Sequence, residues 1–149
     1  MPAQWVCKKF DELTLQELYA ILQLRIEIFV VEQNCAFQDA DNKDMNCYHL
    51  MCWESARLTA YARLVPAGVA FAEVSIGRVV TSSQVRRKGL GKELMQRSIT
   101  NCYALFGKQP LRIGAQLYLK SFYESFGFRT DGSIYLEDGI EHIEMIMHV

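Results

Sequence analysis

The most informative part of the sequence is VRRKGLGKELM, from Val85 to Met95, where a short basic loop with two glycines precedes a helical pattern. A strand-like run, FAEVSIGRVVT at 71–81, comes before it, and helical spacing continues to about Phe106. The first backbone N–H groups of a helix have no partner within the helix and carry partial positive charge. Glycine lets the backbone approach a phosphate closely. The stretch therefore predicts an anion-binding site.

Two common nucleotide-binding motifs do not match this stretch. A Walker A loop requires Gly-x-x-x-x-Gly-Lys-Ser/Thr, but Arg86 stands five residues before Gly91, and Glu93 replaces the hydroxyl residue. The dinucleotide fingerprint G-x-G-x-x-G is half present, since Leu94 occupies the position of its third glycine. A third phosphate-binding pattern, Arg/Gln-x-x-Gly-x-Gly/Ala, is matched without a gap by RRKGLG at 86–91.

A second motif lies further along the chain, in QLYLKSFYESFGF at 116–128. Together the two motifs resemble those of the GNAT superfamily of acyl-CoA N-acyltransferases, whose later motif ends in Tyr-x-x-x-Gly-Phe. Tyr123, Gly127 and Phe128 match it, whereas Gln116 stands where many members have asparagine. The separation and order of the motifs are also those of the family. FVVEQNCAFQDADNKD, EVSIGRVV and EDGIEHIEM further resemble its small bacterial ElaA-type subgroup.

The hydrophobic patterns along the chain predict an α+β, or mixed α/β, fold. A capping box of Thr14 and Glu17 begins a helix that continues to about residue 33, and Asp138-Gly139 indicates a hairpin. The first helix is expected to use one face formed by Leu15, Leu18, Leu22 and Ile26. Further helices are expected at about 90–106 and 117–127, and strands at 4–10, 47–54, 56–66, 71–81, 110–116 and in the terminal hairpin.

The resemblance implies that residues 1–149 form a single acyl-CoA N-acyltransferase domain. Its fold would be a central mixed sheet of about six to seven strands flanked by helices. In this family the strand before the glycine loop splays away from the next strand, and the pantetheine arm of acetyl-CoA lies in the gap. A backbone N–H near Val80 would polarise the acetyl carbonyl, and the backbone from Arg87 to Gly91 would hold the pyrophosphate. The expected cofactor-binding residues are Val79, Val80, Thr81, Arg86, Arg87, Lys88, Gly89, Leu90, Gly91, Lys92 and Gln116.

The implied chemistry is direct attack of a neutral amine on a thioester, through a tetrahedral intermediate, with loss of the CoA thiolate. Tyr123 is the expected general acid, because a phenol titrates near pH ~10 and keeps its proton at neutral pH. The alternative for Tyr123 is an aromatic residue of the core. The base stays open between Glu73 on the central strand, His142 on the terminal hairpin and a water chain.

The segment 32–44 carries Glu32, Asp39, Asp41 and Asp44, and it is the expected region of substrate selection. Acidic groups there would favour a cationic amine, although a solvated polar loop is an equal alternative.

We expect no metal site. An EF-hand loop starting at Asp39 fails, because Asp44 replaces its glycine and Leu50 its bidentate glutamate. CYHLMC at 47–52 lacks a second pair of zinc ligands, and strand alternation points its cysteines and histidine in different directions.

Composition limits the classes of partner. The net charge is −1, which argues against a general nucleic-acid binder. No apolar run approaches the ~20 residues of a membrane span, and the N-terminus lacks the pattern of a secretory signal. Five scattered cysteines indicate reduced thiols and a cytoplasmic protein. The chain could be a monomer or a homodimer, since IEHIEMIMHV could pair between subunits or pack within one.

The sequence thus predicts an acetyl-CoA-dependent N-acetyltransferase acting on a primary amine of an unidentified small molecule or peptide. A CoA-binding sensor or interaction module without catalysis is the main alternative, and the intact Tyr123 argues against it. An ATP-binding domain is a third possibility, against which the failed Walker pattern weighs.

Overall fold

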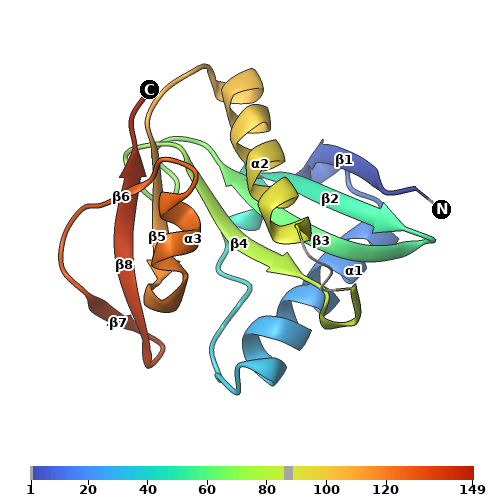
Figure 1. Ribbon diagram of the computed structural model, residues 1–149. Helices are drawn as coiled ribbons and strands as arrows, with labels where there is room; N and C mark the ends of the chain where they lie inside the picture. Colours follow the sequence, from blue (N-terminus) through green and yellow to red (C-terminus); the bar gives the residue numbers. More distant parts are fainter. Residues whose placement is uncertain (1, 86–88) are drawn as a thin grey trace.

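A computed structural model of the protein describes residues 2–85 and 89–149 (Figure 1). Its strands are β1 (Gln4–Lys9), β2 (Tyr48–Glu54), β3 (Arg57–Val65), β4 (Ser75–Thr81), β5 (Leu111–Gln116), β6 (Arg129–Thr130), β7 (Tyr135–Glu137) and β8 (Ile140–Met147). Its α-helices are α1 (Leu15–Arg25), α2 (Leu90–Phe106) and α3 (Lys120–Glu124), and a π-helical segment, η2 (Ile26–Glu32), continues α1. Single 3-10 turns are η1 (Phe10–Glu12), η3 (Asp44–Asn46), η4 (Ser83–Val85) and η5 (Leu117–Leu119).

The strands form two antiparallel sheets. The first has the order β1-β2-β3-β4, and the second has the order β5-β8-β6, with β7 also paired to β8. A parallel bridge between Val74 and Leu111 joins the two sheets, and β4 and β5 diverge beyond it (Figure 1). The predicted fold class, including splayed strands, is confirmed. The described residues contain eight strands, because the two-residue strand β6, which has no sequence pattern of its own, adds to the seven that were expected.

Both faces of the first sheet are covered by helices, α2 on one face and α1 on the other (Figure 1). Leu90, Leu94 and Cys102 of α2 pack with Ala62 and Leu64 of β3. On the opposite face lies a second cluster, which contains Ile21, Leu24, Ile28, Met51, Leu58, Tyr61 and Val80. Burying one such Leu or Ile side chain stabilises the fold by roughly 1.5–3 kcal/mol, so the two clusters hold β3 and β4 rigidly in place.

The capping box at the start of α1 is confirmed, with Thr14 Oγ1 accepting from the Glu17 N–H at 3.0 Å. The expected face of this helix is wrong, however. Leu15 is 82% exposed and Ile26 is 46% exposed, while Ile21 and Leu24 are buried. The reason is that the helix packs with the face that also carries Arg25, a fully buried residue.

The terminal hairpin turns at Asp138 and Gly139, whose φ angles of 52° and 78° are both positive, as a two-residue type I′ turn requires. Its second strand, β8, pairs with β5 on one side and with β6 and β7 on the other. The segment IEHIEMIMHV therefore packs within the chain and offers no free strand edge over the described pairings.

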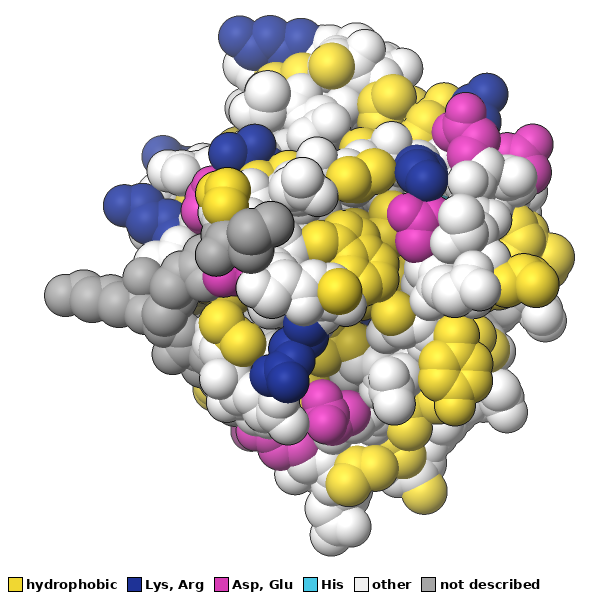
Figure 2. Space-filling view, turned by 90° about the vertical axis from the view of Figure 1, so that its right-hand side faces the viewer, with side chains coloured by type: hydrophobic (Ala, Val, Ile, Leu, Met, Phe, Trp, Pro, Cys, Tyr) yellow, Lys and Arg dark blue, Asp and Glu magenta, His cyan; other side chains and the backbone are white. Residues whose placement is uncertain are grey.

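No helix in the described part of the chain is long and apolar enough to cross a membrane. None of the five cysteines, all of which lie in the described residues, is part of a disulfide. On the face turned to the viewer in Figure 2, basic and acidic side chains are interspersed with hydrophobic ones, and neither sign dominates the atoms that are described.

Candidate active site

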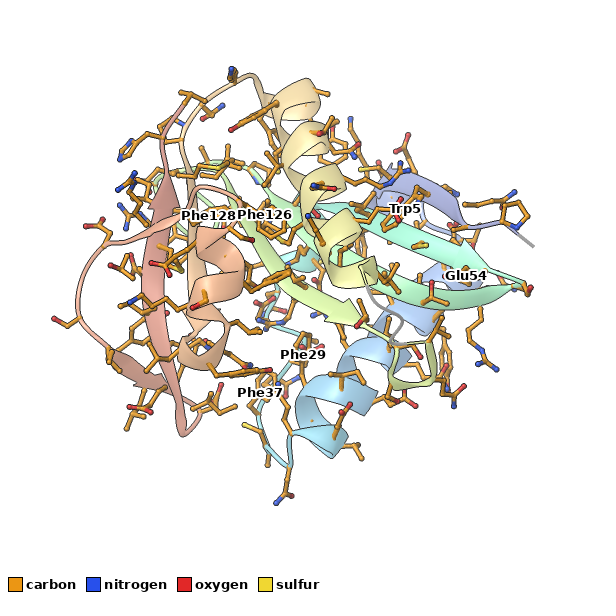
Figure 3. The ribbon with its side chains drawn as sticks, viewed as in Figure 1. Trp5, Phe29, Phe37, Glu54, Phe126 and Phe128 are labelled. Atoms are coloured by element: carbon orange, nitrogen blue, oxygen red, sulfur yellow. The ribbon has the colours of Figure 1, made fainter. Side chains whose placement is uncertain are left out.

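A cleft of about 840 Å³ opens where β4 and β5 diverge. One wall is β4 from Ser75 to Thr81, and the other includes Ile113, Gly114 and Gln116 of β5. The segment after α1 and the β7–β8 hairpin close its wider end. Phe29 of η2 and Phe37 of the following loop line this end (Figure 3). The cleft is thus a channel between two sheet edges, open along the unpaired side of β4.

A β-bulge interrupts β4 beside the cleft. Tyr61 pairs with Val80 and Arg63 with Gly77, so that Arg78 and Val79 together stand opposite Ala62. A bulge leaves its extra residue outside the regular hydrogen-bond ladder and turns the strand. The predicted cofactor-binding residues Val79, Val80 and Thr81 all line the cleft at this point.

The glycine-rich stretch lies at the start of α2, as predicted. Gly89 is the N-cap residue with φ of 91°, a left-handed conformation that favours glycine, and its carbonyl accepts the first helical hydrogen bond from the Glu93 N–H at 3.0 Å. Leu90 is buried in the core, so only its backbone can meet a ligand, whereas Lys92 is exposed. The predicted contributions of Arg86, Arg87 and Lys88 lie outside the described residues.

The two sequence motifs meet in space. A Cβ atom added to Gly91 would lie 3.9 Å from the Phe122 ring, so the first turn of α2 is close to α3. Tyr123 follows on α3, lines the cleft and is only 8% exposed. Its ring lies edge-on to Phe122 and Phe128, with centroids 5.2 and 6.2 Å away.

The Tyr123 hydroxyl has no hydrogen-bond partner within the described parts of the chain. Burial, with a smaller contribution from Tyr118, raises the pKa of Tyr123 to about 12. The phenol therefore keeps its proton at neutral pH and is available to donate it inside the cleft.

His142 also lines the cleft, from the first half of β8, and is 7% exposed. Its Nδ1 lies 2.8 Å from the Ile140 carbonyl oxygen, which can only accept, so Nδ1 carries a proton. Its Nε2 lies 3.5 Å from Oε2 of Glu137, and its ring lies 5.7 Å from that of Tyr135. A neutral His142 with this tautomer presents an acceptor at Nε2.

Glu73, the other predicted candidate for the base, is not among the residues that line the cleft. It precedes β4 and makes a two-pronged ion pair with Arg112, whose Nε lies 3.0 Å from Oε1 and whose Nη2 lies 3.3 Å from Oε2. The hydrogen bond from Arg112 lowers the pKa of Glu73. Arg112 also pairs with Asp131 and Glu144, so Glu73 is part of a surface ion cluster at the junction of the two sheets.

Comparison with known proteins agrees with the family that the two motifs indicate. A family model described as an acetyltransferase (GNAT) domain matches residues 23–149. The chain belongs to the GNAT acetyltransferase family. It is therefore an acyltransferase, of a family that uses acyl-CoA.

Two proteins, one of them compared both by sequence and by structure, resemble this GNAT chain over nearly its whole length. Protein ElaA of Escherichia coli K12 is 40% identical over 148 residues, which are 98% of this chain and 97% of that protein. The crystal structure of E. coli ElaA superimposes with a TM-score of 0.92 at 38% identity, covering 99% of this chain and 100% of that one. An acyl-CoA N-acyltransferase from Pseudomonas aeruginosa superimposes with a TM-score of 0.93 at 43% identity, covering 98% and 99%.

Gln116, where many GNAT members have asparagine, lines the cleft and is engaged by a side chain that the sequence did not point to. Its amide and that of Gln33 donate to each other's oxygens at 3.3 Å. Gln33 follows η2, so this pair of amides bridges the wide end of the cleft. The amide of Gln116 is thus tied to the loop, and a cofactor would have to compete for it.

The acidic segment of this GNAT chain is held in ion pairs. Three of its four carboxylates are bound by arginines in a buried network that consists of Asp39, Asp41, Asp44, Arg25, Arg63 and Arg78. Asp39, Asp41 and Asp44 are each paired with two arginines, so an amine that met these carboxylates would compete with the arginines for them.

Arg25 is the centre of the network, with Nε 2.9 Å from Asp39 Oδ2 and Nη1 2.8 Å from Asp44 Oδ1. Arg63 extends it with contacts of 2.9 Å to Asp44 and 2.8 Å to Asp41. Burial, the largest single influence, raises the pKa of Asp44, but the hydrogen bonds and charges of Arg25 and Arg63 together lower it overall. The pKa of Asp41 is likewise lowered: burial is the largest single influence and raises it, but Arg63, the Lys43 N–H and Arg78 together outweigh burial.

His49, considered above with Cys47 and Cys52, has both ring nitrogens occupied by protein partners. Its Nδ1 lies 2.6 Å from the Tyr61 hydroxyl and its Nε2 lies 2.9 Å from the Asp44 carbonyl oxygen. Within residues 2–85 and 89–149, no group of His, Cys, Asp and Glu side chains is arranged to hold a metal ion.

Proposed function

We propose that the chain transfers an acetyl group from acetyl-CoA to a primary amine of a small molecule or peptide. The observation that supports this most strongly is the cleft itself. The outer edge of β4 lines the cleft, and the glycine-capped start of α2 follows β4 and η4 in the chain, so extended backbone groups and helical N–H groups succeed one another in the sequence. This order suits a ligand with an extended amide-bearing arm and a pyrophosphate at its end.

The cofactor residues that this proposal uses are the backbone of Val79, Val80 and Thr81 for the arm, and Gly89 to Lys92 for the pyrophosphate. Bound acetyl-CoA would supply the thioester as the electrophile. A backbone N–H at the bulge would stabilise negative charge on the carbonyl oxygen, an effect worth ~3–4 kcal/mol where such a donor has been removed from other enzymes.

Two side chains would handle the protons. Tyr123 would donate its phenolic proton to the leaving sulfur, since burial keeps this group protonated. His142 would accept a proton at Nε2 from the attacking amine, directly or through water, and Glu137 would stabilise the resulting imidazolium from 3.5 Å. The new bond joins the amine nitrogen to the acetyl carbon, and the bond to sulfur breaks.

A CoA-release assay over polyamines, aminoglycosides, amino acids and peptide N-termini tests this function. Calorimetry with acetyl-CoA, CoA and ATP on the full chain accompanies it. We expect saturable acetyl-CoA binding at sub-millimolar concentration, no comparable binding of ATP, and amine-dependent release of CoA. An absence of acetyl-CoA binding would reject the proposal, and binding without release for any amine would favour the non-catalytic CoA module.

A further inference from the structure

Arg78 occupies a position in the β4 bulge that usually requires glycine. Its φ angle is 49°, in the left-handed region. A bulge whose first residue is left-handed normally has glycine there, because a Cβ atom makes this conformation unfavourable by roughly 1–2 kcal/mol. Strained backbone of this kind persists only where the surroundings hold it.

The Arg78 side chain is held from several directions by the segment between η2 and η3. Its Nε lies 2.9 Å from Asp39 Oδ1, and its Nη2 donates to the Asp39 carbonyl oxygen at 3.0 Å and to Asp41 Oδ2 at 3.3 Å. Its guanidinium carbon lies 5.7 Å from the centre of the Phe37 ring. Nη2 supplies both hydrogen bonds, Nε meets Asp39 as an ion pair, and the guanidinium lies over the Phe37 ring, a combination that lysine cannot reproduce.

The carboxylates that bind Arg78 are themselves held by other arginines. Asp39 is also bound by Arg25, which is fully buried, and Asp41 is bound by Arg63. Arg78 therefore connects the bulge to a rigid part of the core, and its side chain is only 22% exposed. Arg78 and the next residues, Val79 and Val80, all line the cleft.

We propose that Arg78 is a positioning residue: its anchored side chain holds the left-handed bulge, and the bulge sets the direction of the Val79 and Val80 backbone in the cleft. This inference rests on the proposed function, because the groups so directed are those assigned to the thioester carbonyl. Arg78 itself acts through the backbone and needs no contact with the reacting atoms.

Three variants at one position separate the side chain from the backbone. Arg78→Gly removes the anchor but tolerates the left-handed conformation, Arg78→Ala removes the anchor and adds strain, and Arg78→Lys keeps the charge. Asp41→Asn weakens the anchor from its other end without altering Arg78. Arg129→Ala, at an exposed arginine of β6, is the control for loss of one positive charge.

The first readout does not depend on catalysis. Amide hydrogen exchange over 75–81 in the ligand-free protein should be faster in Arg78→Gly and Arg78→Ala than in the wild type, and unchanged in Arg129→Ala. Equal exchange in the wild type and in both Arg78 variants would overturn the proposal, whatever the chain's activity. If Arg78→Gly or Arg78→Ala fails to fold, the exchange of Asp41→Asn and Arg78→Lys is compared with that of the wild type in its place.

The second readout compares the effect of each variant on kcat with its effect on the affinity for CoA. In Arg78→Gly and Arg78→Ala, we expect kcat with acetyl-CoA and the best amine to fall by about tenfold to a hundredfold, as for a misplaced reacting group. The affinity for CoA, which lacks the carbonyl, should change less than about threefold. Full kcat in Arg78→Gly would overturn the role of the anchor. A wild type that neither binds nor cleaves acetyl-CoA would instead reject the proposed function. The hydrogen-exchange comparison alone would then test whether Arg78 holds the bulge.

Discussion

Val74 pairs with Leu111 in a parallel bridge, and this pairing is the apex of a wedge between the two sheets. The Arg112 N–H donates to the Val74 carbonyl oxygen at 2.9 Å, and the Arg112 side chain binds Glu73 beside it. From this apex β4 and β5 diverge, and the β4 edge is left free to meet a ligand. The wedge explains why a chain with two separate sheets has one continuous cleft.

Tyr123→Phe should lower kcat by about a hundredfold, since general acid catalysis contributes about 10²–10⁴-fold, with little change in acetyl-CoA affinity. Steady-state kinetics and calorimetry measure the two effects, and Tyr19→Phe, at a 71% exposed position, is the matched control. Normal turnover by Tyr123→Phe would remove the acid role.

The pH dependence of Tyr123 has a defined sign. The pKa of Tyr123 in the folded state, about 12, lies above the ordinary value of ~10. Its contribution to stability is therefore present below pH ~10 and is lost as the pH rises through about 12. In a profile of kcat against pH, ionisation of Tyr123 should therefore cause no decrease in kcat at pH values under ~10.

His142→Gln and Glu73→Gln should differ, although the sequence offered both residues as bases. We expect the first to lower kcat/KM by about a hundredfold, because it removes the acceptor at Nε2. The second should change kcat/KM less than about threefold, because Glu73 lies outside the cleft and pairs with Arg112. Equal effects of the two changes would contradict the assignment of His142.

The two glycines of the opening stretch should respond differently to alanine. Gly89→Ala places a Cβ atom at a φ angle of 91°, which costs roughly 1–2 kcal/mol and should weaken acetyl-CoA binding about tenfold. The Cβ of Gly91→Ala meets the Phe122 ring at an ordinary 3.9 Å, so binding should change less than about threefold. Calorimetry with acetyl-CoA measures both, and a reversed order would contradict the described start of α2.

The buried ion network should dominate the response to acid. Arg25→Met leaves Asp39 and Asp44 short of a partner and should lower the free energy of unfolding by ~3–5 kcal/mol in urea titrations. Arg97→Met, at a half-exposed pair with Glu93, should cost less than ~1 kcal/mol.

The sign of the pH effect follows from the lowered pKa values of Asp41 and Asp44. Carboxyl groups depressed in the folded state stabilise it above their ordinary pKa of ~3.9 and lose this contribution as the pH falls below it. Wild-type stability should therefore decline below pH ~4, and more steeply than that of Arg25→Met. Equal slopes would show that the network contributes little.

Local signals in the sequence predicted the parts of this fold that depend on neighbours along the chain. The capping box of Thr14 and Glu17 and the turn at Asp138-Gly139 each involve residues at most three positions apart. The two GNAT motifs likewise located α2 and Tyr123. The sequence could not show contacts between residues that are far apart along the chain and meet only in the folded structure.

Arg25 illustrates this limit. In a helical pattern an arginine at this position predicts a solvated side chain, yet Arg25 is fully buried. The pattern gives no sign of this, because the carboxylate partners lie 14 and 19 residues further along the chain, in a segment without periodicity. The bulge at Arg78 has no sequence signal either, since arginine replaces the expected glycine. The Gln33–Gln116 pair joins residues 83 positions apart.

Amide hydrogen exchange of the full chain with and without saturating acetyl-CoA tests the cleft assignment most directly. We predict slower exchange over β4, 75–81, and at the start of α2, 89–92, because the ligand would pair with the outer edge of β4 and with the first N–H groups of the helix, neither of which has a strand or helix partner in the described residues. Exchange in β1 and β2 should stay unchanged. Protection that is absent from β4 and from the start of α2, or confined to other elements, would contradict the account.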